Sequence, residues 1–183
     1  MPLVNPGALA GGATPPDIEA WLATLGLEPI DRAERDGIAS WDLVLDGRRR
    51  FDLRVTVILD PSLALICWAH YAPPINDMFR KSYRRLLRWN DEFPFAKFSV
   101  GEDERPLLTV ETPIDVASAA GADGLGLALA RIVGIADQLL DASRDWIWIG
   151  GRMPDQVGRT PRNTAFLERM AARLPELFGE APS

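Results

Sequence analysis

The stretch MFRKSYRRLLRWN, residues 78–90, decides how the rest of the chain is interpreted. Its larger side chains recur at helical spacing and predict a helix with one face against a sheet, formed by Phe79, Tyr83, Leu86, Leu87 and Asn90. Its basic side chains point away from that face. Alternating, strand-like patterns occur over 41–71 and 95–112. The helix is therefore expected to be the pivot of an α+β domain.

The sequence before this stretch predicts one helix and three strands. Thr14 can cap a helix that begins at the two following prolines and ends at Gly26. Residues 28–37 are expected to form a loop. Alternation then predicts strands over 39–45 and 49–59, with Asp46 and Gly47 as a tight hairpin turn between them. The nearly all-apolar run 63–71 predicts a third strand, either a central one covered on both sides or one that faces a partner. These strands are expected to form a meander.

The sequence after the stretch predicts a second hairpin, from strands 95–100 and 107–112 around a charged turn. A loop of small residues over 117–124 and a long amphipathic helix over 125–140 follow. The expected order is α-β-β-β-α-β-β-α. We expect a flexible lead over 1–14, the α+β domain over 15–143, and a C-terminal extension over 144–183 with one amphipathic helix after Thr160 and Pro161.

The charge balance limits the partners that the protein can bind. The 183 residues carry a formal net charge of −6, which argues against nucleic acid, because such binding depends on Lys and Arg meeting phosphates. No basic region precedes an apolar one at the N-terminus, so a secretory signal is not expected. The longest apolar run, 63–69, is far shorter than the roughly 20 residues of a membrane span. With Cys67 as the single cysteine, the sequence favours a soluble, cytoplasmic protein.

No catalytic, metal-binding or cofactor-binding constellation is evident in the sequence. His70, the single histidine, ends an apolar strand without an evident partner, which favours a structural role. Cys67 falls in a core position, and these two residues cannot make a zinc site. Gly124 and Gly126 do not fit a dinucleotide loop, because Leu129 stands where a further glycine is needed. We expect no cofactor and no enzyme activity, although an apolar pocket holding His70 beside a carboxylate would revive an enzyme hypothesis.

Two surfaces are candidates for binding a partner. The first is the basic face of the helix, with Arg80, Arg84, Arg85 and Arg88, near the arginines at 48–50 and 54. It is either a solvated face, paired with the acidic turn at 102–104, or a docking surface for an acidic partner segment. The second surface contains Trp146 and Trp148, which either pack on the core or form an exposed interaction patch.

The run RRLLRWNDEFPFAKFSVGEDERPLLTVETPID, residues 84–115, followed by IADQLL at 135–140, resembles the YbjN-like family of bacterial sensory transduction regulators. In that family a helix ending in a Leu-x-x-x-Asn segment joins a strand that begins Ala-Lys-Phe. Here Leu86 and Asn90 occupy the first pattern, and Ala96, Lys97 and Phe98 occupy the second. The resemblance covers residues 21–142.

The resemblance implies a fold and a mode of action. The family is similar in fold to the type III secretion chaperones, which implies an α+β protein with a strongly bent antiparallel sheet, often a homodimer. It further implies that the protein binds an extended or partly unfolded protein segment and performs no chemistry. The tail beyond Asp145 lies outside the resemblance and is a candidate cover for the groove or sheet edge that such a segment would use.

We therefore expect a non-enzymatic, chaperone-like adaptor that binds a protein partner by its sheet edge or by a groove. The alternative is a regulatory module that recognises an anionic ligand or nucleic acid through the arginine face. A homodimer is a separate expectation.

Overall fold

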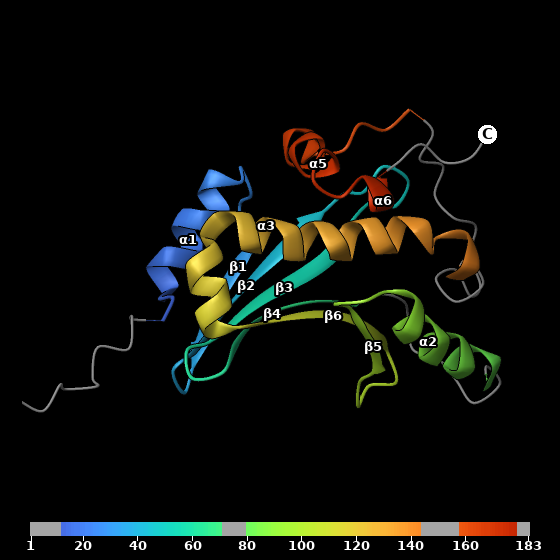
Figure 1. Ribbon diagram of the computed structural model, residues 1–183, viewed down its shortest axis with the longest axis horizontal. Coiled ribbons are helices and arrows are strands. Elements are labelled where there is room, and N and C mark those ends of the chain that lie inside the picture. Colours follow the sequence, from blue (N-terminus) through green and yellow to red (C-terminus); the bar gives the residue numbers. More distant parts are fainter. Residues whose placement is uncertain (1–11, 71–79, 144–157, 179–183) are drawn as a thin grey trace, which may run out of the picture.

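The computed structural model of the protein describes residues 12–70, 80–143 and 158–178 (Figure 1). Its helices and strands are, in chain order, α1 (Pro15–Thr24), β1 (Asp31–Arg35), β2 (Ile38–Leu45), β3 (Leu53–Asp60), β4 (Ala64–His70), α2 (Arg80–Glu92), β5 (Lys97–Val100), β6 (Pro106–Pro113), α3 (Ile114–Gln138), the 3-10 helix η2 (Asp141–Ser143), α5 (Thr164–Ala171) and α6 (Pro175–Phe178). The six strands form one antiparallel sheet in the order β1-β2-β3-β4-β6-β5. The predicted α+β class, antiparallel sheet and C-terminal helix are confirmed.

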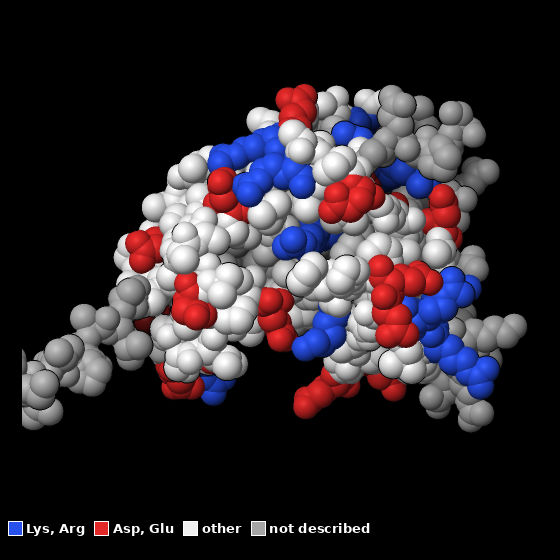
Figure 2. Space-filling view, in the orientation of Figure 1, with Lys and Arg blue, Asp and Glu red and all other residues white. Residues whose placement is uncertain are grey.

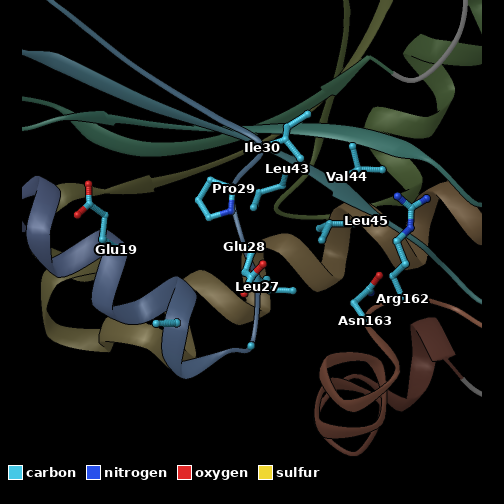
Figure 3. A pocket seen from close by; sticks show the side chains of 12 residues that line it. Glu19, Leu27, Glu28, Pro29, Ile30, Leu43, Val44, Leu45, Arg162 and Asn163 are labelled. Carbon is cyan, nitrogen blue, oxygen red and sulfur yellow. The ribbon is translucent and has the colours of Figure 1, made fainter.

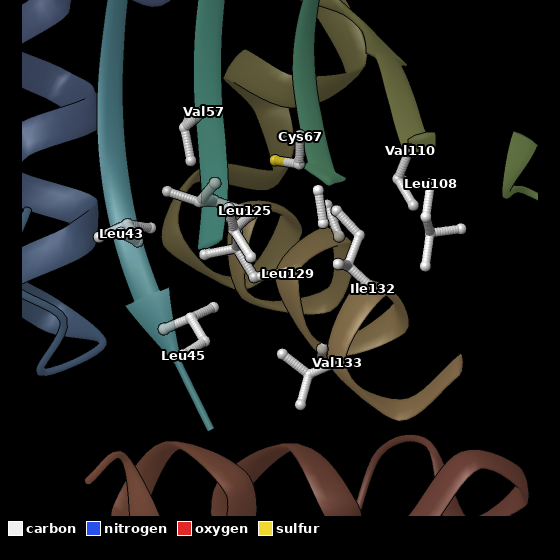
Figure 4. Packing of buried hydrophobic residues seen from close by; sticks show 14 of the residues in the cluster. Leu43, Leu45, Val57, Cys67, Leu108, Val110, Leu125, Leu129, Ile132 and Val133 are labelled. Carbon is white, nitrogen blue, oxygen red and sulfur yellow. The ribbon is translucent and has the colours of Figure 1, made fainter. Parts of the chain in front are cut away.

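The core lies between the sheet and α3. Alternate residues of the central strands face α3, so that Val57, Cys67 and Val110 are buried against Leu125 and Leu129 (Figure 4). Each large aliphatic side chain buried in this way contributes about 1.5–3 kcal/mol. Burial also raises the pKa of the Cys67 thiol to about 12, in keeping with its predicted core position.

The helices α5 and α6 pack on the other side of α3 and form a third layer (Figure 1). Two glycines of α3 allow this approach. A Cβ at Gly134 would lie 2.8 Å from the Cβ of Leu177, and one at Gly126 would lie 3.3 Å from the sulfur of Met170. By length and composition α3 could span a membrane, but 56% of its most apolar window is buried. This burial fits the core helix of a soluble protein.

The predicted loop at 28–37 is wrong, because it contains β1. Every residue of β1 is exposed, and four of its five side chains are charged, so no apolar period marks the strand. Asp36 and Gly37, with φ of 54° and 79°, form the tight turn to β2. The β1–β2 hairpin was not predicted, whereas the predicted pairing of the next two strands is present as β2 and β3, without the tight turn at Asp46 and Gly47.

Residues 46–52 form a loop between β2 and β3 instead of a tight turn. The loop wraps around the carboxylate of Asp137, which lies in α3 with a side chain only 6% exposed. This carboxylate accepts backbone N–H groups from Arg48 at 2.6 Å, Arg49 at 3.0 Å and Arg50 at 2.7 Å. A side chain at Gly47 would collide with it, so the glycine is needed for close approach.

The helix α2 occurs where it was predicted, but it is not the pivot of the fold. Leu86 and Trp89 are buried, each 3% exposed, and Trp89 packs on Phe98 of the edge strand β5. Leu87, predicted to face the sheet, is 67% exposed. Phe79 lies outside the described residues. The sheet is covered by α3, which also includes the predicted loop at 117–124 and kinks at Gly121.

The predicted C-terminal helix is confirmed, with a different start. Asn163, rather than Thr160, precedes α5 as its N-cap residue. Phe166, Leu167 and Met170 are buried on its apolar face. Pro175 begins the separate short helix α6.

Replacing Asp137 by Ala removes the acceptor of three backbone N–H groups in a buried site. We expect D137A to lower the free energy of unfolding by about 3 kcal/mol or more, measured by urea denaturation. The matched control is D141A, because Asp141 contacts the same loop through an exposed ion pair with Arg49, 2.7 Å long. Such a pair contributes about 0–1 kcal/mol, so equal losses in the two variants would contradict this role of Asp137.

Candidate binding groove

A groove of about 600 Å³ lies at the edge of the sheet beside β2 (Figure 3). One wall is the segment 26–30, which joins α1 to β1, and the opposite wall is formed by Arg162 and Asn163 of the C-terminal segment. Residues 43–45 of β2 lie between the two walls. The volume is within the roughly 300–1,000 Å³ of ordinary ligand-binding sites.

The groove occupies a gap in the strand pairing along β2. Pairing of β1 with β2 stops at Asp31 opposite Asp42, and the N–H of Ile30 donates to the same Asp42 carbonyl at 2.8 Å. Because backbone groups alternate in direction along a strand, Val44 directs its N–H and C=O to the same side as Asp42, away from β3. The described residues provide no hydrogen bond to either group of Val44. Within the described part of the chain, the sheet thus presents one N–H and one C=O without a partner to the groove.

The side chain of Asn163 closes the far end of the gap, because it makes the two backbone hydrogen bonds that a neighbouring strand would make. The amide of Asn163 accepts the N–H of Asp46 at 2.8 Å and donates to the Asp46 carbonyl at 2.9 Å. Ile30 thus satisfies the edge on one side of Val44, and Asn163 satisfies it on the other. The open edge between them is a single residue of β2, Val44.

Ion pairs of Arg159 and Arg162 with Asp46 and Asp52 hold the Asn163 wall in place. Arg162 donates to both carboxylate oxygens of Asp46, at 3.0 and 3.1 Å, and also contacts Asp52. Arg159 forms a bidentate pair with Asp52 at 2.6 and 2.9 Å. The hydrogen bond from Arg159 lowers the pKa of Asp52 to about 2, with Arg162 assisting against partial burial. Burial raises the pKa of Asp46, but hydrogen bonds from the Asp52 N–H and Arg162 lower it overall.

The groove combines an apolar floor with a single uncompensated charge. Leu27, Leu43 and Leu45 are each at most 5% exposed and form the floor, whereas Ile30 on the rim is 60% exposed. The Glu19 carboxylate is paired with Arg32 at 2.9 Å. Glu28 is exposed and has no ion pair within the described part of the chain. Its apolar floor suits the binding of an apolar segment.

The arginine face of α2 is only partly free to bind a partner. Arg85 donates to the Ala142 carbonyl, and Arg88 pairs with Glu92 of the same helix at 2.7 Å, not with the turn at 102–104. Arg84 is exposed. Figure 2 shows acidic and basic side chains next to one another over α2. Of Arg80 the structure describes only the backbone, and Trp146 and Trp148 lie outside the described residues.

His70 and Cys67 do not form a reactive site. The Nδ1 atom of His70 is buried without a hydrogen-bond partner among the described residues, and its ring lies 5.6 Å from that of Trp68. Cys67 is fully buried on the opposite face of the strand. No group of His, Cys, Asp and Glu residues suited to a metal ion occurs in the part of the chain that the structure describes.

Sequence reasoning did not find the groove, because its parts are far apart in the chain. Asp46 and Asn163 are separated by 117 positions and carry no local motif. The one available signal was Asn163 itself, a polar residue just before an apolar helical period, which is typical of a helix cap.

Comparison with known families identifies the class of protein. The family described as "putative bacterial sensory transduction regulator", YbjN, matches residues 14–145. The chain belongs to the YbjN family, as the resemblance implied. A search of curated proteins gives no match. Arg159, Arg162 and Asn163 lie beyond the matched residues, so one wall of the groove is an addition to the family domain.

Acid should weaken the contact between the C-terminal segment and the loop that joins β2 to β3, because protonation of Asp52 removes its ion pairs with Arg159 and Arg162. Because the folded-state pKa of Asp52 lies below the ordinary value of 3.8, its pairing stabilises the protein above that pH and is lost as the pH falls toward 2. We expect D52N to lose less stability than the unmodified protein between about pH 5 and about pH 2.5 in urea denaturation. D103N, at an exposed turn, is the control and should retain the full acid sensitivity. An unchanged acid sensitivity in D52N would contradict this role.

Proposed function

We propose that the protein is a non-enzymatic adaptor that holds an extended segment of a partner protein in the groove beside β2. The observation that carries the proposal is the unpaired N–H and C=O of Val44 in a groove with a leucine floor. An extended segment placed there pairs with the sheet edge through its backbone and buries alternate side chains on the floor. Membership of a family of regulators supports an adaptor at the coarse level.

The C-terminal extension takes part in this binding as a wall of the groove rather than as its cover. Residues 158–178 pack on α3 and bring Arg162 and Asn163 beside β2. They leave the edge at Val44 open while closing it at Asp46. The partner segment is therefore confined to a short site with two defined ends.

Site-specific photo-crosslinking in native cell extract tests the proposal. A photoreactive amino acid is placed at position 30 on the rim, or at position 87 on α2 as a control for the arginine face. We expect one partner to be crosslinked from position 30. V44P should abolish that crosslink, because proline removes the edge N–H but leaves the pairing with β3, which uses the neighbouring residues. V44A keeps the N–H and should retain it.

Two results would contradict the proposal. One is a crosslink from position 30 that V44P does not weaken while circular dichroism shows V44P to be as well folded as V44A. The other is crosslinking from position 87 alone, which would favour the anionic-ligand alternative on α2. Homodimerisation remains a prediction of the family resemblance, and the mass in solution at micromolar concentration tests it.

A further inference from the structure

We infer that the segment bound in the groove is cationic, with a lysine or arginine next to alternating apolar residues, and that Glu28 selects it. This inference rests on the proposed function and adds the chemistry of the partner. It follows from three properties of the groove: its charge, the spacing of its apolar floor, and the position of its closed end.

The charge of the groove is decided by Glu28. Arg162 is the basic residue among the lining side chains, and its charge is compensated by Asp46 and Asp52. Glu19 is compensated by Arg32. Glu28 therefore gives the groove a net negative charge that a basic residue of the partner can neutralise. A charge pair at this exposed position chooses between partners more than it adds affinity, since a like charge placed there is repelled.

The floor of the groove requires apolar residues at alternate positions. Leu43 and Leu45 point to one side of β2, and Val44 between them points to the other. A segment paired with Val44 directs the residues on either side of its paired position to the same side as the two leucines. Those two positions are the apolar ones. The side-chain amide of Asn163 blocks pairing beyond this point, so the recognised segment is short.

Selection from a random peptide library tests the inference directly. Seven-residue peptides displayed on phage are selected on the full-length protein, on E28K and on E102K. Glu102 is an exposed residue of the turn between β5 and β6, so E102K makes the same change of charge at the opposite side of the sheet. We expect peptides with Lys or Arg beside alternating apolar residues from the unmodified protein and from E102K. E28K should lose this basic preference, with at least a tenfold drop in affinity for the selected peptides.

The outcomes separate this inference from the proposed function. Peptides that bind the protein but not V44P, with no basic preference or with one that E28K leaves unchanged, would overturn the inference and leave the groove as the binding site. Peptides that bind V44P as well as V44A would overturn both. Failure to select any peptide would also overturn both, because an open sheet edge over a leucine floor must bind some extended sequences.

Discussion

The carboxylate of Asp137 fixes the loop on which the edge of the sheet depends. It is buried within α3, and the three successive N–H groups of residues 48–50 replace the water that a buried carboxylate loses. Burial raises the pKa of Asp137, and these donors oppose that rise. Gly47 is required beside it for steric reasons. The loop from β2 to β3 is thereby held in one conformation, with Asp46 presented to the C-terminal segment.

That conformation connects the core to the surface groove. Asp46 uses its backbone to bind the Asn163 amide and its carboxylate to bind Arg162, so one residue both ends β2 and anchors the groove wall. Ile30 and Asn163 then satisfy the sheet edge on both sides of Val44 and leave that residue open. Unpaired sheet edges are normally covered or blocked, and the charged side chains of the edge strand β1 disfavour pairing with another strand. A one-residue opening over an apolar floor is a departure from this rule, which is why we connect it with binding.

The sequence allowed the fold class to be predicted better than the site. Alternation identified β3, which buries every second residue, and a nearly all-apolar run identified β4. It missed β1, whose exposed residues have no apolar period. It also overvalued α2, where Arg85 binds the Ala142 carbonyl and Arg88 pairs with Glu92, and took the small residues at 117–124 for a loop although they belong to α3. The groove could not be predicted, since the Asn163 amide acts on a strand 117 residues away.

Amide hydrogen exchange along β2, measured residue by residue with NMR, tests the open edge most directly. The N–H groups of Leu43 and Leu45 pair with β3, and that of Asp46 is bound by Asn163, so all three should exchange slowly. The Val44 amide, directed into the groove, should exchange orders of magnitude faster than its neighbours. Protection of Val44 equal to that of Leu43 and Leu45 in the free protein would contradict the open edge and, with it, the proposed site.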